Sequence, residues 1–366
     1  MMFKILSMPL AVSLALVSAG LISTSASAAP QIYGAIYINS DASYSRTKTS
    51  YTDGTPTEIT SGRNRVLIFD DASRIGIRGS ETLSDKVDLR YRIEWRNPFD
   101  VDKRTLEPRD AWIGLAHKDY GTIKAGRMLT YDAYLNDMPW GRPSYFDGIR
   151  TNNSVRYESP VIKGNQLTVQ YIMDENTDGS TAGTDSLNGD GYAVSLSRST
   201  DKYNIGVAYI DANADEMSEP RGVMYIGQPL NEALRINASY QATPTVKLAA
   251  MYQQNSHNGT QYGEAAKTEK AFAIGASRTL DKSVELYSQV NVFKDFNEYG
   301  TRYDDKFDII FGAKKDFSPS TYAGVEVFYY QKSVDVPAHM DGEKAIKAHR
   351  IEDQTSGLSV YTGFHF

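Results

Sequence analysis

The chain has 366 residues, no cysteine and a formal net charge of −6 at pH 7. The absence of cysteine excludes a small fold stapled by disulfides, and the acidic balance argues against nucleic acid as a partner. No Pro/Gly/Ser-rich linker and no shift in composition divides residues 29–366, so we expect one domain there.

Residues 1–28 show the pattern of a cleaved secretory signal peptide. Lys4 precedes an apolar stretch, Leu10–Ile22, and Ala26-Ser27-Ala28 fits an A-x-A cleavage site. A membrane anchor is the alternative, but the apolar stretch is shorter than the roughly 18–20 residues that a spanning helix needs. We therefore expect the mature chain, residues 29–366, to leave the cytoplasm.

Apolar and charged residues alternate strictly between positions 87 and 96. The apolar positions are Val87, Leu89, Tyr91, Ile93 and Trp95, and the charged ones are Asp88, Arg90, Arg92, Glu94 and Arg96. A strand places the two sets on opposite faces, whereas a helix would mix them. An alternation of apolar and polar residues recurs at 167–173, 234–240, 284–292 and 307–314, and no helical pattern of comparable strength lies between these segments.

Short turns alternate with longer polar connections along the chain. The short turns are predicted at residues 81–85, 117–121, 160–165, 200–203, 242–245, 280–283 and 318–321. The long connections are predicted at residues 40–64, 97–108, 127–153, 174–190, 210–230, 255–270, 294–305 and 332–356. Seven short and eight long connections imply sixteen strands. An even strand number with short turns at one end and long loops at the other is typical of bacterial outer-membrane barrels.

These patterns predict an all-β fold: a transmembrane antiparallel β-barrel of 16 strands. A sheet in lipid must close on itself because lipid cannot hydrogen-bond the backbone, and sixteen strands leave a water-filled lumen that tolerates charge. A soluble β-sandwich also alternates, but dense charge on so many strand faces favours the barrel.

Aromatic residues near strand ends on the apolar face would form interfacial girdles, although aromatic residues favour strands in general. They are Trp95, Tyr171, Tyr209, Tyr240, Tyr252 and Phe364. At the end of the chain, Leu358, Val360, Phe364 and the terminal Phe366 share one face. A last strand that ends in Phe resembles the signal read by the barrel-assembly machinery, so Phe366 is the candidate assembly signal.

The mature chain resembles the general porins of Gram-negative bacteria, in order along its whole length. The segments that carry the resemblance are Ile32-Tyr33-Gly34 and residues 73–83, 109–115, 120–127, 147–150 and 153–160. The resemblance implies a bacterial outer-membrane protein, a homotrimer, and a third loop (loop 3) folded into the pore. Residues 128–146, within loop 3, depart from the family pattern, which leaves the selectivity of the pore open.

Pore diameter and lining charges would set the selectivity of such a channel. The candidate constriction residues are the loop 3 acids Asp132, Asp137 and Asp147. The candidate basic wall is formed by Arg74, Arg78, Arg90, Arg92, Arg96, Lys124, Arg127 and Arg156. Acids on the loop facing bases on the wall would give a field across the pore, although any single loop acid could instead be a solvated charge. Tyr33 and Tyr37 are also expected either to line the lumen or to pack beneath loop 3.

We predict a water-filled channel for passive diffusion of ions and small hydrophilic solutes. A substrate-selective channel on the same scaffold is the alternative, because arginines on one strand face would permit a binding track. A barrel enzyme or receptor is less well supported, since the five histidines show no metal-ligand spacing and no G-x-S-x-G or phosphate-loop motif occurs. We expect no enzymatic activity, cofactor or metal; the expected partners are solutes, outer-membrane lipid, the barrel-assembly machinery and further copies of the chain.

Overall fold

The computed structural model of the chain describes residues 29–366 except 65, 101–105, 131–134, 136, 140–149, 174–189, 212–223, 226–227, 258–259, 262–263, 266–267, 282, 299–300 and 342–343. The predicted signal peptide at residues 1–28 lies outside the described residues. None of the described residues belongs to a helix that is long and apolar enough to cross a membrane.

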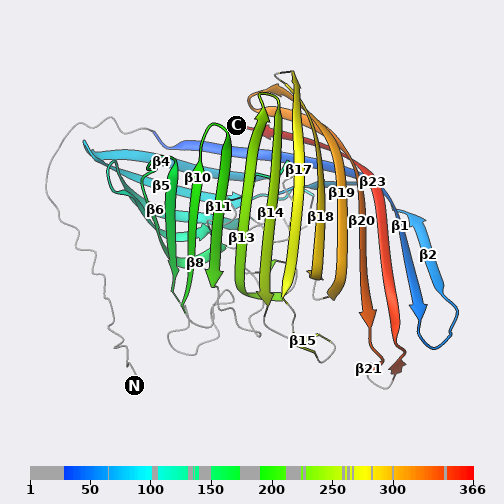
Figure 1. Cartoon of the computed structure of the whole chain (residues 1–366). Helices are drawn as coiled ribbons and strands as arrows, with labels where there is room; N and C mark the ends of the chain where they lie inside the picture. The colour runs from blue at the N-terminus through cyan, green and yellow to red at the C-terminus, as the bar shows by residue number, and fades with distance from the viewer. Residues whose placement is uncertain are drawn as a thin grey trace, which may run out of the picture.

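Nineteen strands of the described chain form one antiparallel sheet, in which β2, β3 and β12 are short additions and the other sixteen form a closed ring (Figure 1). In ring order the sixteen are β1 (Gln31–Tyr51), β4 (Arg74–Ser84), β5 (Val87–Arg96), β6 (Glu107–His117), β7 (Gly121–Leu129), β8 (Arg150–Glu158), β9 (Asn165–Ile172), β10 (Gly191–Ser199), β11 (Tyr203–Asp211), β13 (Gln228–Thr243), β14 (Val246–His257), β17 (Glu269–Asp281), β18 (Val284–Glu298), β19 (Thr301–Ser318), β20 (Thr321–Val336) and β23 (His349–His365). β1 pairs with β4 on one side and with β23 on the other, which closes the barrel. The predicted 16-stranded barrel is confirmed, and the sandwich alternative is wrong because the sheet closes on itself.

The short strands lie at the end of the barrel that carries the long connections, called here the loop end. They are β2 (Glu58–Arg63), β3 (Leu67–Asp70), β12 (Met224–Tyr225), β15 (Thr260–Gln261), β16 (Glu264–Ala265), β21 (His339–Asp341) and β22 (Lys344–Ile346). β2 and β3 pair with β1 beyond the point where β4 stops, so β1 and β2 form a hairpin that extends past the ring (Figure 1).

All seven predicted short turns join consecutive strands of the ring, at what is called here the turn end. Four predicted long connections, 40–64, 255–270, 294–305 and 332–356, are wrong in extent because strands occupy most of them. Their strand ends are polar yet remain paired: Thr47 lies opposite Asp353 and donates a side-chain hydrogen bond of 2.7 Å to it. Outside lipid nothing requires alternation of apolar residues, so these strand ends look like loops in the sequence.

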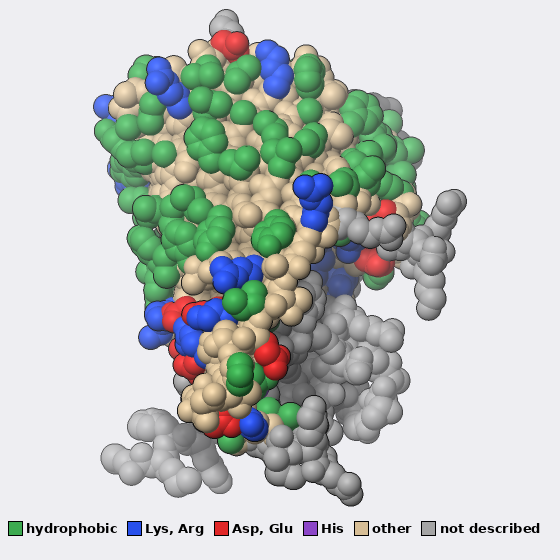
Figure 2. All heavy atoms as spheres, turned by 90° about the vertical axis from the view of Figure 1, so that its right-hand side faces the viewer, with side chains coloured by type: hydrophobic (Ala, Val, Ile, Leu, Met, Phe, Trp, Pro, Cys, Tyr) green, Lys and Arg blue, Asp and Glu red, His purple; other side chains and the backbone are tan. Residues whose placement is uncertain are grey.

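The outer face of the ring is apolar and the inner face is polar. On β13, Ile236 is 43% exposed on the outside, whereas its neighbour Asn237 is 3% exposed on the inside. On β5, Ile93 likewise lies exposed on the outside and its neighbour Glu94 lies buried on the inside. Figure 2 shows apolar side chains spread over the middle of the wall and a dense group of charged side chains toward the loop end. Such a belt matches the hydrocarbon layer that a transmembrane barrel must face.

Two bands of outward aromatic residues border the apolar belt. Near the loop end Tyr192 pairs with Tyr171 on the next strand, and its ring centroid lies 6.0 Å from that of Tyr209. Near the turn end Tyr203 pairs with Tyr240. Tyrosine prefers the membrane–water interface, where its ring is in the apolar layer and its hydroxyl reaches water.

Replacing Ile236 with Arg should destabilise the barrel, because the new charge would enter the apolar belt. A charge at the bilayer midplane costs roughly 2–4 kcal/mol in such barrels, against about 0–1 kcal/mol near the interface. Gln254→Arg is the matched control, since Gln254 lies on the outer face past Tyr252 and opposite the exposed Lys270. Urea unfolding in lipid vesicles measures the free energy of unfolding of both variants. An equal decrease in the two variants would contradict the position of the belt.

Candidate functional site

Two regions of charged side chains on the inner face meet at Tyr37. The arginine cluster surrounds a cavity of about 310 Å³. Its charged members are Arg74, Arg92, Arg109, Arg150, Glu94 and Asp110. The tyrosine chamber, of about 620 Å³, lies against β1, β18, β19, β20 and β23. The two regions are connected because Tyr37 lines the chamber and its hydroxyl accepts a 2.9 Å hydrogen bond from Arg74.

Glu94 is the most enclosed acid of the arginine cluster, with 1% of its surface exposed. Its Oε1 accepts a hydrogen bond from Arg109 at 2.6 Å. Its Oε2 accepts a 2.9 Å bond from the Tyr33 hydroxyl and a further bond from Arg92. A buried carboxylate is tolerated only when charged donors surround it, so Glu94 fixes the positions of two arginines in the wall.

Asp110 is the second buried acid of the arginine cluster. It accepts a 2.9 Å hydrogen bond from Nε of Arg150, and Nε of Arg92 lies 3.7 Å from its other oxygen. The cluster therefore contains four guanidinium groups and two carboxylates, a formal charge of +2. Arg74 makes its 2.9 Å contact with a neutral hydroxyl, so within the described part of the chain no acid is bound to its guanidinium group.

A β-bulge brings Arg109 and Asp110 to the same side of the wall although they are consecutive residues. Opposite β5, strand β6 contributes one extra residue at this point. Such a bulge interrupts the alternation of side chains and re-aims them. Both side chains consequently reach the lumen, where Arg109 binds Glu94 and Asp110 binds Arg150.

Among the predicted basic residues, the structure brings Arg78 and Arg92 together beside Tyr33, and Arg74 lines the same cavity as Arg92, beside Tyr37. The guanidinium of Arg78 lies 4.9 Å and that of Arg92 lies 5.3 Å from the centroid of the Tyr33 ring. The other five have partners of their own: Arg90 near Asp88, Arg96 near Asp70 and Glu107, Lys124 with Glu158, Arg127 with Asn152, and Arg156 with Gln170. Arg156 is 3% exposed and also donates to the carbonyl of Leu129, at the start of loop 3.

Four members of the cluster were not among the site residues predicted from the sequence: Glu94, Arg109, Asp110 and Arg150. The alternation in residues 87–96 already places Glu94 on the same face as Arg92, so that signal was present. Arg109 carries no such signal, because its inward direction depends on the bulge.

The described residues of loop 3, which joins β7 to β8, lie against the inner wall opposite the arginine cluster's strands. Asp137 accepts hydrogen bonds from Asn237 on β13 at 2.9 Å and from Asn204 on β11 at 3.3 Å. The ammonium of Lys247 on β14 lies 3.3 Å from the same carboxylate. Loop 3 thus crosses the lumen at this point. The other two predicted loop acids, Asp132 and Asp147, lie outside the described residues.

Glycines on the wall make room for loop 3. A Cβ atom at Gly206 would lie 2.6 Å from Leu135, and one at Gly275 would lie 2.6 Å from Pro139. Leu135 and Met138 are 6% and 7% exposed, so the loop packs closely onto strands β11 and β17. The position of the loop is therefore encoded partly in the wall.

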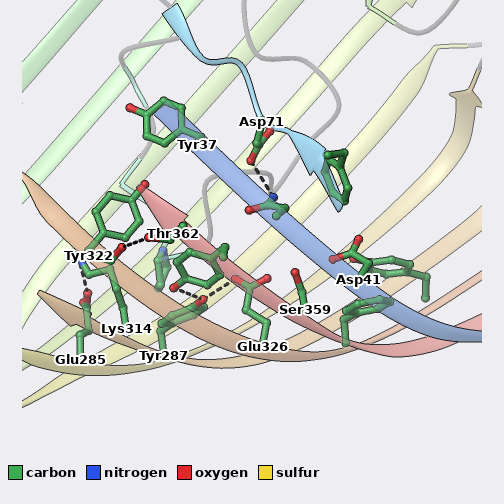
Figure 3. A pocket seen from close by; sticks show the side chains of 16 residues that line it. Tyr37, Asp41, Asp71, Glu285, Tyr287, Lys314, Tyr322, Glu326, Ser359 and Thr362 are labelled. Atoms are coloured by element: carbon green, nitrogen blue, oxygen red, sulfur yellow. Dashed lines mark hydrogen bonds and ion pairs between the residues drawn. The ribbon is translucent and has the colours of Figure 1, made fainter. Parts of the chain in front are cut away.

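The tyrosine chamber was not predicted from the sequence. The hydroxyl of Tyr287 donates a hydrogen bond to Glu326 and lies 2.9 Å from the hydroxyl of Tyr361 (Figure 3). The ammonium of Lys314 lies 3.9 Å from Glu285. Four strands thus contribute carboxylates, hydroxyls and aromatic rings to one wall of the lumen.

Comparisons with known proteins agree with this architecture. The family model described as Gram-negative porin matches residues 13–333. The major outer membrane protein P.IB of Neisseria meningitidis is 25% identical over 320 residues, which cover 82% of this chain and 87% of that protein. Chitoporin of Vibrio furnissii is 30% identical over 139 residues, which are 33% of this chain and 37% of chitoporin. The solved anion-selective porin from Comamonas acidovorans matches with a TM-score of 0.61 at 14% identity, covering 93% of this chain and all of that one.

A closed barrel with an apolar outer belt and a charged, water-lined interior is a transmembrane channel protein. The chain belongs to the Gram-negative porin family. It is an outer-membrane channel for passive diffusion of ions and small hydrophilic solutes.

Replacing Asp137 with Ala should loosen loop 3, because it removes every contact of this carboxylate with β11, β13 and β14. Hydrogen bonds to a charged group contribute about 1.5–3 kcal/mol. We expect noisier open-channel current and closure at lower voltage in planar bilayers. Asp137→Asn, which retains an acceptor oxygen, should lie between Ala and the native residue; unchanged noise in the Ala variant would show that the carboxylate does not hold the loop.

Proposed function

We propose that the passage of solutes is controlled where loop 3, the arginine cluster and the tyrosine chamber border the same lumen. The observation that carries the proposal is the separation of charge on the wall: the cluster has a formal charge of +2, and the chamber has four carboxylates and one ammonium, a formal charge of −3. Unlike charges on adjoining walls create a field across the pore, which selects among ions and dipolar solutes.

In this proposal the negative side of the field comes mainly from the wall. Of the predicted loop 3 acids, Asp137 is occupied by contacts with Asn204, Asn237 and Lys247. The chamber carboxylates, including Asp41 and Glu326, line a larger open volume. Asp132 and Asp147 remain proposed constriction residues. The eight basic residues predicted from the sequence likewise remain a proposed lining of the pore. We propose general diffusion, with an anion path along the arginines, as the primary function.

Three features of the predicted protein belong to the same proposal. We infer that a signal peptide is removed after residue 28, that the mature chain forms a homotrimer, and that Phe366 is part of the signal for the barrel-assembly machinery. The position of Phe366 supports this proposed role, because Phe366 exchanges backbone hydrogen bonds of 3.0 and 3.1 Å with Gly34 at the seam between the first and last strands.

Replacing Arg74 and Arg78 with Gln should shift the ion preference of the channel toward cations. A unit charge 4 Å from a passing ion contributes about 1 kcal/mol in water, or roughly a fivefold change in local occupancy. These two arginines, Arg74 of the cluster and Arg78 beside the cluster residue Tyr33, are chosen because their hydrogen-bond partners are neutral, Tyr37 and Gln31, so no buried acid loses its partner. The measurement is the reversal potential of single channels in a planar bilayer under a salt gradient.

Arg90→Gln is the matched control for this experiment. Arg90 lies on β5, next to the β4 strand of Arg74 and Arg78, but it is half exposed and near Asp88 toward the turn end. Its replacement should change the reversal potential less than the Arg74/Arg78 pair does. An equal shift, or none in either variant, would remove the arginine cluster from the controlling position.

Deleting Phe366 should lower the yield of folded barrel in the outer membrane more than it lowers the conductance of the channels that do form. The deletion removes two backbone hydrogen bonds at the seam and the ring that lies over Gly34. Phe366→Tyr keeps all of these and should assemble normally. The measurement is heat-modifiable migration of membrane fractions on gels; full assembly of the deletion variant would contradict the role.

A further inference from the structure

We infer that the tyrosine chamber binds organic cations: an ammonium group carried on an apolar or aromatic body. The inference rests on the proposed function, because such a solute must reach the chamber through the water-filled pore. Nothing in general diffusion requires a built site on the wall. Four features of the chamber point to one, namely its ring faces, its charge, the setting of its own ammonium group, and its size.

The tyrosines of the chamber lie flat along the wall because glycines on neighbouring strands make room for them. A Cβ atom would lie 2.3 Å from the Tyr287 ring at Gly312, 2.2 Å from the Tyr361 ring at Gly324, and 2.4 Å from the Tyr322 ring at Gly363. One face of each ring therefore covers a glycine backbone. All three tyrosines line the chamber (Figure 3), and Tyr322 and Tyr361 are partly exposed, whereas Tyr287 is 5% exposed and contributes mainly its hydroxyl.

The charge of the chamber favours a cation. Asp41, Asp71, Glu285 and Glu326 line it, and Lys314 is the one basic side chain among its described lining residues. The Oδ1 atom of Asp41 is buried and has no hydrogen-bond partner among the residues that the structure describes. A buried carboxylate oxygen without a donor is costly, and an ammonium N–H is the donor that the chamber's formal charge of −3 would attract most strongly.

Lys314 shows how an ammonium group is held in this setting. Its Nζ lies 3.9 Å from Glu285 and 3.4 Å from Asp316, and 5.7 Å from the centroid of the Tyr322 ring. This combination of carboxylate and ring face is the usual recognition of an ammonium by a protein. The chamber offers the same combination a second time: Asp41 on β1 and Glu326 on β20 both lie opposite Ser359 of β23, two residues from Tyr361. A second ammonium, from a solute, could be held there.

The size and the neighbours of the chamber fit a small organic molecule. Its volume of about 620 Å³ falls within the roughly 300–1,000 Å³ that is usual for small-molecule sites. Phe328 and Tyr330, stacked with centroids 4.8 Å apart, add apolar surface for the body of the ligand. The arginine cluster beyond Tyr37 would repel such a cation, which keeps it on the chamber side of the lumen.

The test uses the full protein in a planar bilayer, with open conductance in potassium chloride measured first. Phenylethylammonium chloride is then added, and 2-phenylethanol, phenylacetate and maltotriose serve as the neutral, anionic and sugar comparisons. We expect phenylethylammonium to interrupt or lower the channel current, and we expect no such effect from the three comparison compounds. Asp41→Asn combined with Glu326→Gln should weaken the apparent affinity for phenylethylammonium about 25-fold, since each of the two charges contributes roughly a fivefold factor at contact distance in water.

Asp88→Asn is the matched control, because it removes one carboxylate from the inner face of β5 outside the chamber. It should leave the block unchanged. Tyr361→Leu keeps the charges but removes a ring face, and it should weaken the block severalfold. Equal block by 2-phenylethanol or maltotriose, or full block in the double variant, would overturn the inference.

Isothermal titration of phenylethylammonium into detergent-solubilised protein tests the chamber without any conductance. Binding that is lost in the double variant, in a protein with no open conductance, would support the site and contradict the proposed function. Open conductance without binding or block would overturn the inference and leave the proposed function standing.

Discussion

Lipid offers no hydrogen bonds to a polypeptide backbone, and the whole structure depends on satisfying that constraint within the sheet. Strand β1 is central to the solution, because it pairs with β23 along one edge and with β4, β3 and β2 along the other. Two backbone hydrogen bonds between Gly34 and Phe366 complete the seam. Once the sheet is closed, every strand has one face toward lipid and one toward the lumen. The period of two in the sequence is the direct consequence.

Closure also makes an unusual interior possible. A carboxylate such as Glu94, at 1% exposure, would be prohibitive in an apolar core. In this barrel its neighbours on the inner wall are Arg92, Arg109 and Tyr33, all of which hydrogen-bond to it or to each other. Because water fills the remaining lumen, the wall does not need equal numbers of the two charges in each region. That freedom allows a positive cluster and a negative chamber to exist side by side.

The sequence predicted those features that follow from local period and turn chemistry. The alternation around Ile93 and the seven short turns were enough for the strand number, and they placed Arg74 and Arg92 in the lumen. Features that depend on pairing between distant segments were not predicted from the sequence. Arg109 turns inward through a bulge opposite β5, and the polar end of β1 stays a strand because β23 pairs with it. The flat ring of Tyr322 needs Gly363, which is distant in sequence and adjacent only in the folded sheet.

The overall charge of −6 therefore says little about what passes through the channel. Fields are screened within a Debye length of about 8–10 Å at moderate ionic strength, so a solute responds to the wall nearest to it. An anion near Arg74 and a cation near Glu326 experience opposite local charges in one lumen. Since inward side chains are not needed to pair the backbone, they can change without opening the barrel. The strand pattern thus defines the channel, and a small number of inward residues on the adjoining walls defines its preference.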